Sequence, residues 1–198
     1  GLAKEGMIPF CNVYSSFMQR AYDMVIHDVA LQNLHMVICL DRAGLVGEDG
    51  ATHQSVEDMA IMRSLPNMTV VCPADGAETE AVIRAAVAHD GPVYVRMGRA
   101  KVDDVYQSGC PFQWGKGTVL RDGCDAAVIA TGLMVQMALK AREMMAAEGV
   151  SVRVIDMHTI KPLDGELVRK AALETGCIVT SEEHSIIGGL GGAVAEFL

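Results

Sequence analysis

Short apolar runs rich in β-branched residues alternate with amphipathic segments along the first hundred residues. The period-two runs predict strands, and the segments with helical spacing predict helices. The strands are expected at Ile8–Val13, Met36–Asp41, Thr69–Cys72 and Val93–Met97, and the helices at Ser15–Asn33, Val56–Leu65 and Glu78–His89. This alternation is typical of a parallel sheet covered by helices.

The pattern lapses at residues 100–125, where glycines accumulate around the single Trp, and such a lapse favours a domain boundary. The alternation then resumes, with strands expected at Ala126–Ala130, Ser151–Ile155 and Ile178–Thr180 and helices at Met134–Glu148 and Asp164–Glu174. The predicted fold class is α/β, with two parallel-sheet domains at residues 1–101 and 125–198 joined by a linker at 102–124.

The two ends of the chain carry no leader pattern and no helix stop. The last residues, Gly192–Leu198, have helical character without a cap or breaker. We therefore expect both domains to be truncated, the first without its start and the second without its end.

Composition excludes several classes of function. The 198 residues are 51% apolar, which is enough for a buried core, and 16 Lys and Arg against 25 Asp and Glu give a net charge of −9. The chain therefore has no excess of positive charge with which to bind nucleic acid or an anionic membrane. No apolar run is long enough for a membrane span. Six cysteines without zinc spacing favour reduced thiols, no metal site and a cytoplasmic location.

The loop that follows the predicted second strand is the richest in chemical groups. Residues 41–54 combine three glycines with an Arg, a His and several carboxylates, at the strand end where open α/β sheets bind ligands. Asp49 and His53 are four residues apart and can converge on one polar substrate group. The alternative is a solvated turn ahead of the next helix.

Two further groups of residues could bind a ligand. Phe17 and Arg20 share a helical face, so a flat heteroaromatic ring could stack on Phe17 while Arg20 holds its polar edge, although a core aromatic beside a surface Arg has the same spacing. Arg96 and Arg99 follow a strand and suit a phosphate or carboxylate; a surface salt bridge fits them equally well.

The glycines of Glu182–Gly192 precede a predicted helix, as in a phosphate loop. The segment lacks the Lys-Ser/Thr pair of such loops, and its two adjacent Glu residues would repel phosphate. Close backbone packing is the favoured interpretation, with a structural role for His184.

Together these motifs resemble the transketolase family of thiamine-diphosphate enzymes over essentially the whole chain. Gly47–Gln54, Arg63–Val70 and Pro73–Asp75 resemble its pyrimidine-binding domain. Ile155–Asp164 and Glu182–Gly191 resemble the carboxyl-terminal domain of bacterial split transketolases.

The first third of the chain is more similar to 1-deoxy-D-xylulose 5-phosphate synthase, a member of the same superfamily. The similarity lies in Tyr14–Asp23, His27–Ala30 and Asp41–Gly44. Transketolases commonly have a substrate-contacting His where this chain has Asp41, whereas Asp41 followed by Arg42 is the synthase pattern.

The resemblance implies a role for each candidate residue. Tyr14 and Phe17 would line the thiamine pyrimidine pocket, with Arg20 supporting it. Asp49 and His53 would act as the catalytic pair that hydrogen-bonds the substrate. The implied substrate-binding residues are Asp41, Arg42, Asp49, His53 and Arg99, with Arg42 and Arg99 on the substrate phosphate.

The resemblance also implies groups that this sequence does not contain. The family deprotonates thiamine diphosphate with a Glu expected just upstream of Gly1, and an amino-terminal domain holds the diphosphate and Mg²⁺. We therefore expect this chain to be inactive alone, to need that domain or subunit as a partner, and to form a homodimer.

The expected activity of the parent enzyme is transfer of a two-carbon ketol unit between phosphosugars. One alternative is the synthase reaction of pyruvate with glyceraldehyde 3-phosphate. The other is a non-catalytic dimerisation half of a split enzyme.

Overall fold

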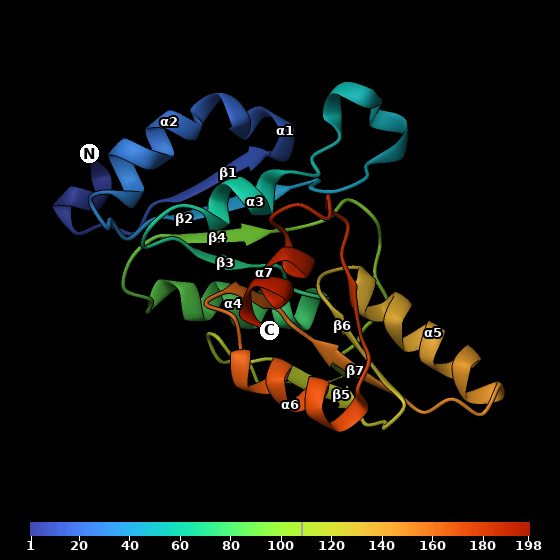
Figure 1. The fold of residues 1–198 in the computed structure, drawn as a ribbon. Coiled ribbons are helices and arrows are strands. Elements are labelled where there is room, and N and C mark those ends of the chain that lie inside the picture. Colours follow the sequence, from blue (N-terminus) through green and yellow to red (C-terminus); the bar gives the residue numbers. More distant parts are fainter. Residues whose placement is uncertain (108) are drawn as a thin grey trace.

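A computed structural model of the chain describes residues 1–107 and 109–198 and contains two mainly parallel sheets (Figure 1). The first sheet has the order β1 (Phe10–Tyr14), β2 (Val37–Asp41), β4 (Val93–Arg96), β3 (Thr69–Val71) and β8 (Thr159–Lys161). The second has the order β5 (Thr118–Arg121), β7 (Val152–Asp156), β6 (Ala126–Ala130) and β9 (Ile178–Ser181).

Helices cover both sheets. The first sheet is accompanied by the short helices η1 (Leu2–Glu5), α1 (Ser15–Met18), η2 (Gln19–Ala21), α2 (Tyr22–Met24) and η3 (Val25–Ala30), and by α3 (Asp58–Arg63) and α4 (Gly76–Val87). Around the second sheet lie α5 (Met134–Ala147), α6 (Gly165–Thr175) and α7 (Leu190–Phe197). Figure 1 shows α1 and α2 on one side of the first sheet and α4 on the other.

The central strand β2 shows why its sequence is apolar throughout. Ile38 and Leu40 pack into the core beneath α1 and η3, whereas Val37 and Cys39 pack with Val82 of α4 on the opposite face. A strand that is covered on both faces has no solvent-facing position, so its residues form a continuous hydrophobic run.

The two sheets are mainly parallel, as the sequence predicted, and each also contains one antiparallel pair. β8 pairs antiparallel with β3, and β5 pairs antiparallel with β7. β8 comes from the second half of the chain but completes the first sheet, so the two halves share main-chain hydrogen bonds. β5 lies inside the range 102–124 that was predicted to be a linker, and the second sheet therefore begins before residue 125.

The predicted helix Ser15–Asn33 is a chain of short segments instead of one α-helix. Its hydrogen-bond pattern tightens to a 3₁₀ turn at Gln19–Ala21 and widens to a π turn at Val25–Ala30. Hydrophobic spacing does not distinguish these turns from a regular α-helix, because all of them bury one face. The other predicted elements lie within two residues of those observed.

Among the described residues, no helix combines the length and the apolar character needed to cross a membrane.

Candidate active site

Three rings meet at the carboxyl end of the first sheet. Tyr14 ends β1, Phe17 lies in α1, and His53 lies in η5 (Ala51–His53) of the loop after β2. The ring centroids are 5.1 Å apart for Tyr14 and Phe17, 5.2 Å for Tyr14 and His53, and 5.4 Å for Phe17 and His53. The Phe17 residue is 53% exposed, so part of its side chain is accessible to a ligand.

Asp49, in η4 (Gly47–Asp49), is the centre of the polar part of this cluster. One carboxylate oxygen accepts a 2.7 Å hydrogen bond from the Tyr14 hydroxyl and lies 3.9 Å from Nε of Arg42. The other oxygen lies 3.3 Å from the Arg99 guanidinium. The Tyr14 hydrogen bond and the two guanidinium groups hold the pKa of Asp49 below its ordinary value.

The same contacts keep Tyr14 neutral. Burial, followed by the hydrogen bond to Asp49, raises the pKa of the Tyr14 phenol above its ordinary value. At neutral pH the pair therefore consists of a phenol that donates and a carboxylate that accepts.

Arg42 reaches the cluster through an unusual backbone conformation. Its φ is +57°, in the left-handed region that costs a non-glycine residue about 1 kcal/mol or more, and the Ser15 hydroxyl donates a 2.7 Å hydrogen bond to its carbonyl oxygen. The guanidinium lies 5.4 Å from the centre of the Tyr14 ring and donates a 2.8 Å hydrogen bond to Asp41. Asp41 is thus tied to Arg42 and belongs to the edge of the cluster.

Arg99 stands on the opposite side of Asp49. It also donates a 2.8 Å hydrogen bond to Glu48, and these two carboxylates raise the pKa of Arg99 further above its ordinary value. Its side chain is about one-third exposed. Both arginines can exchange an exposed carboxylate partner for an incoming anion.

His53 has one ring nitrogen in use. Nδ1 lies 3.0 Å from the Thr52 hydroxyl, and no partner of Nε2 is found among residues 1–107 and 109–198. Nε2 is therefore free to contact a substrate.

The two ends of the loop that carries Asp49 and His53 pair with each other through main-chain hydrogen bonds. The main chains of Gly44 and Ser55 exchange two hydrogen bonds of 2.7 and 3.1 Å. Inside the loop, the Gln54 amide accepts a hydrogen bond from the Val46 N–H and donates one to the Gly50 carbonyl, both 2.8 Å long. Gly50 has a φ of +88°, a conformation that favours glycine.

The structure brings together most of the predicted site residues. The clustered residues are Tyr14, Phe17, Arg42, Asp49, His53 and Arg99, with Asp41 at the edge. Arg20 is exposed, and within the described part of the chain no hydrogen bond or ion pair joins it to the cluster. Its supporting role stays a prediction.

Arg96 matches neither of the two interpretations that the sequence left open, because its side chain is buried and paired instead of standing exposed at the strand end. It is 3% exposed, and its Nε and Nη2 donate hydrogen bonds of 2.8 and 3.1 Å to Asp58. The Tyr94 hydroxyl donates a 2.6 Å hydrogen bond to the same carboxylate. Tyr94 and Arg96 are two apart on one face of a buried strand, and that spacing in an otherwise apolar run is the signal that the sequence analysis missed.

The segment Glu182–Gly191 packs closely, as the sequence predicted. A side chain on Gly188 would meet Ala60 at 2.7 Å, and the N–H groups of Leu190 and Gly191 donate to the Glu182 carboxylate. The amino end of α7 is therefore occupied by a carboxylate of its own chain. His184 accepts a 3.4 Å hydrogen bond from the Ala60 N–H, a structural contact.

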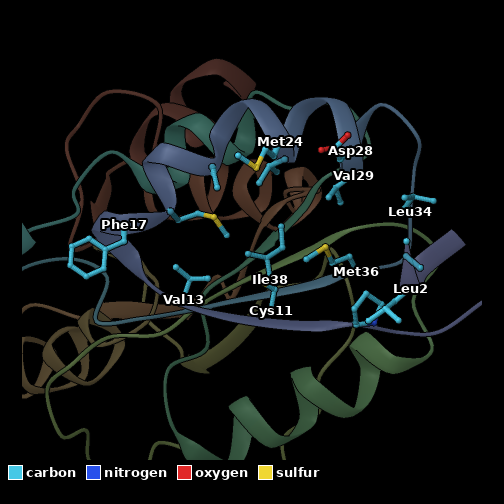
Figure 2. A pocket seen from close by; sticks show the side chains of 16 residues that line it. Leu2, Cys11, Val13, Phe17, Met24, Asp28, Val29, Leu34, Met36 and Ile38 are labelled. Atoms are coloured by element: carbon cyan, nitrogen blue, oxygen red, sulfur yellow. The ribbon is translucent and has the colours of Figure 1, made fainter.

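A large apolar groove runs from this cluster along the edge of the sheet (Figure 2). Its cavity volume is about 430 Å³, and most of its lining comes from apolar side chains of η1, β1, β2 and the helices α1 to η3. In Figure 2, Phe17 lies at one end of the groove and Leu2 and Leu34 lie at the other. Phe17 therefore belongs to both the groove and the polar cluster.

These residues fit one half of thiamine diphosphate. The half-exposed Phe17 side chain beside an apolar groove suits a flat heteroaromatic ring such as the pyrimidine. Among the residues that the structure describes, no group of three or more His, Cys, Asp or Glu side chains could hold a metal ion.

Comparison with known families gives two matches that together cover almost the whole chain. Residues 1–104 match the family described as "Transketolase, pyrimidine binding domain". Residues 115–198 match "Transketolase, C-terminal domain".

Comparison with individual proteins gives matches to enzymes of the same kind. The chain is 51% identical to the 1-deoxy-D-xylulose-5-phosphate synthase of Parabacteroides distasonis and 44% identical to synthase 1 of Geobacter sulfurreducens, in each case over 100% of the chain. It covers 32% and 31% of these relatives, so it spans about a third of their length. A solved structure titled "Split gene transketolase, inactive beta4 tetramer" matches with a TM-score of 0.94 and 44% identity, over 99% of this chain and 64% of that one.

Proposed function

Since this chain belongs to the transketolase family, we propose that it is part of a thiamine-diphosphate-dependent enzyme that makes 1-deoxy-D-xylulose 5-phosphate from pyruvate and glyceraldehyde 3-phosphate. The observation that carries this proposal is the 44–51% identity to two synthases over the whole chain. The residue at the end of β2 supports it as well. Asp41 stands at this position and pairs with Arg42, whereas transketolases commonly have a substrate-contacting His at the position of Asp41.

The second candidate is transfer of a two-carbon ketol unit between phosphosugars, which the sequence motifs favoured as the main expectation. The match to the split-gene transketolase structure supports it. The identities over the full chain favour the synthase, because both named relatives carry that name.

Either reaction needs more than this third of the enzyme. We propose that the diphosphate-binding domain, its Mg²⁺ and the Glu that deprotonates the cofactor come from the rest of the polypeptide or from a partner subunit, and that the assembly is a homodimer. The six cysteines form no disulfide in the described part of the chain, and this supports a reducing, cytoplasmic setting.

In this proposal Phe17 provides the surface on which the pyrimidine ring stacks, with Tyr14 beside it. When bound, thiamine diphosphate supplies the nucleophilic carbon and stores the electron pair that the reaction releases. The apolar side chains next to Phe17 exclude water from that ring.

Arg42 and Arg99 bind the phosphate of glyceraldehyde 3-phosphate. A guanidinium group binds phosphate through two parallel N–H donors, and both arginines present exposed guanidinium groups on either side of Asp49. Their present partners, Asp41 and Glu48, are exposed carboxylates that an anion can replace.

Asp49 and His53 have different tasks. Because its pKa is lowered, Asp49 is ionised at neutral pH and accepts hydrogen bonds from substrate hydroxyl groups. His53 has Nε2 available to a ligand, so in this proposal its imidazole contacts the substrate carbonyl oxygen and acts there as the acid–base group.

The test compares the two substrate pairs on the whole enzyme that contains this chain. Pyruvate with glyceraldehyde 3-phosphate is expected to release carbon dioxide, whereas xylulose 5-phosphate with ribose 5-phosphate is expected to react slowly or not at all. The opposite ranking would favour ketol transfer. Asp49→Ala is expected to reduce the faster activity, while Asp103→Ala, which removes an exposed partner of Lys140, serves as the control.

A further inference from the structure

Ser15 connects the segment that carries Tyr14 and Phe17 with the start of the loop after β2. It is the first residue of α1 and is 1% exposed. Its hydroxyl donates a 2.7 Å hydrogen bond to the carbonyl oxygen of Arg42, which lies 27 residues further along the chain. The hydroxyl proton therefore goes to another segment of the chain instead of to the helix that Ser15 begins.

The place of this bond in the sheet explains why a side chain supplies it. Tyr14 and Asp41 are the last pair in the register of β1 and β2. One residue further along, the main chain of β1 turns into α1, so the parallel ladder has ended where Arg42 stands. Because a main-chain carbonyl shielded from water needs a donor, the Ser15 hydroxyl takes over from the ladder.

The peptide unit between Arg42 and Ala43 is held at both of its polar groups. Its carbonyl accepts the bond from Ser15, and its N–H, which belongs to Ala43, donates a 2.9 Å hydrogen bond to the Met97 carbonyl. Ser15 follows β1 and Met97 follows β4, the two strands on either side of β2. The two bonds therefore anchor this peptide unit from both neighbouring strands.

Arg42 needs such anchoring because its backbone adopts a conformation that is rare for arginine. Among the described residues, the non-glycine positions with positive φ are Asn33, Arg42 and Asn67. Asparagine tolerates the left-handed region better than most side chains do, because its short amide can hydrogen-bond locally. At Arg42, whose φ is +57°, the surrounding contacts must hold the conformation instead.

The backbone conformation of Arg42 sets the direction in which its side chain leaves the chain. In this conformation the guanidinium lies 5.4 Å from the centre of the Tyr14 ring, and its Nε lies 3.9 Å from Asp49. A return of Arg42 to a common backbone conformation would redirect its Cβ and move the guanidinium relative to Asp49.

From these contacts we propose that Ser15 is a positioning residue, which holds the main chain of Arg42 so that the guanidinium faces the phosphate of the substrate. The proposal rests on the proposed function for its substrate and on the contacts above for its geometry. Ser15 lies between Tyr14 and Phe17, so one short stretch of chain both lines the cofactor surface and orients a substrate-binding group.

The first test is a crystal structure of the whole enzyme with Ser15→Ala. Without the hydroxyl the Arg42 carbonyl loses its donor, so Arg42 is expected to leave the left-handed region and its guanidinium to move away from Tyr14. The control is Thr175→Val, which removes another buried hydroxyl that donates to main-chain carbonyls and is expected to leave Arg42 as in the wild type. An unchanged conformation of Arg42 in Ser15→Ala would overturn the proposal.

Kinetics provide the second readout. Ser15→Ala is expected to raise the KM for glyceraldehyde 3-phosphate about fivefold, the effect of one lost hydrogen bond, whereas the KM for pyruvate stays close to that of the wild type. In an Arg42→Ala background the same change is expected to alter the KM by less than about twofold, because the group through which Ser15 acts is gone. Equal effects in both backgrounds, or a parallel rise of both KM values, would overturn the proposal.

Inactivity of the wild-type enzyme toward both substrate pairs would instead overturn the proposed function. The crystal structure of Ser15→Ala would still decide whether Ser15 holds Arg42, because that comparison needs no substrate.

Discussion

The hydroxyl of Tyr14 donates a 2.7 Å hydrogen bond to Asp49, which lies 35 residues further along the chain. The bond ties the end of β1 to the loop after β2 and places a carboxylate beside an exposed aromatic face. It is the largest cause of the lowered pKa of Asp49.

Replacing Tyr14 by Phe is therefore expected to raise the pKa of Asp49 toward the ordinary value of a carboxyl group. The side-chain carboxyl signal of Asp49, followed by NMR as pH is varied, measures the change. Tyr22→Phe is the matched control, because its hydroxyl donates a bond of similar length, 2.8 Å, to the Ile61 carbonyl away from the cluster. An unchanged titration of Asp49 in Tyr14→Phe would contradict the assigned role of the hydrogen bond.

Phe17→Ala separates ligand binding from folding. The ring is half exposed, so its loss is expected to change the unfolding free energy little. The affinity of the whole enzyme for thiamine diphosphate is expected to fall about tenfold, since an aromatic stack contributes roughly 0.5–1.5 kcal/mol beyond its buried area. Calorimetric titration with the cofactor and Mg²⁺ measures this change.

Phe10→Ala provides the control for that experiment, because Phe10 is also exposed and lies at the opposite end of β1. Equal cofactor affinities in the Phe17 and Phe10 variants would remove Phe17 from the proposed binding surface.

The sequence predicted the clustered side chains because they stand at the carboxyl ends of strands, and parallel strands bring those ends to one edge of a sheet. Asp49, His53 and Arg99 meet there as expected. The bond from Tyr14 to Asp49 depends on how the loop folds back over β1, and no local spacing encodes that. The burial of Arg96 was not predicted for a related reason: its acceptor, Asp58, lies 38 residues away, and only the fold shows that the guanidinium is enclosed.

The strands and most helices were predicted because their hydrophobic periods are strong and their boundaries carry Gly, Asp or Pro. The antiparallel pairing of β8 with β3 was not predicted, since three residues at Thr159–Lys161 give no pattern that distinguishes one sheet from the other. The strand Thr118–Arg121 was missed because glycines flank it on both sides.

Arg99→Ala tests the phosphate-binding role. Loss of a charge-assisted hydrogen bond to phosphate costs about 1.5–3 kcal/mol, so the KM for glyceraldehyde 3-phosphate is expected to rise roughly 10- to 100-fold. The KM for pyruvate, which has no phosphate, is expected to change much less. Arg84→Ala removes an exposed, ion-paired arginine on α4, outside the cluster, and serves as the control. A parallel rise in both KM values would contradict a specific contact with phosphate.

The buried pair of Asp58 and Arg96 is expected to matter for stability. Asp58→Ala leaves an uncompensated guanidinium and an unpaired Tyr94 hydroxyl, and its cost is expected to be about 3–5 kcal/mol. Glu80→Ala breaks the exposed pair with Arg84 and is expected to cost less than about 1 kcal/mol. Denaturant unfolding of the two variants measures the loss of unfolding free energy in each. Similar losses would show that burial does not make the Asp58–Arg96 pair more important for stability than an exposed pair.

Glu78 and Asp156 form a second buried polar group, at the junction between the two sheets. Burial is the main cause that raises the pKa of both carboxyls, and their mutual contact raises the pKa of Glu78 further. The Tyr106 hydroxyl donates a 2.7 Å hydrogen bond to one oxygen of Asp156, whereas the other oxygen finds no donor among the described side chains. Because its pKa is raised to about 9, Glu78 is expected to carry a proton at neutral pH, and a protonated carboxyl can act as a donor toward Asp156.

Because both pKa values are raised by folding, the folded chain binds more protons than the unfolded chain above about pH 4, where free carboxyls ionise. The two carboxyls therefore make their full contribution to the unfolding free energy below that pH. As pH rises toward the raised pKa values, the unfolding free energy falls by about 1.4 kcal/mol per pH unit for each extra proton that the folded chain holds. Glu78→Gln keeps a permanent N–H donor toward Asp156, so its unfolding free energy is expected to fall less steeply between about pH 5 and pH 9. Glu80→Gln, two residues along α4 and exposed, is expected to follow the wild type. Denaturant unfolding across this pH range measures the slopes, and parallel slopes for Glu78→Gln and the wild type would show that Glu78 carries no proton that folding depends on.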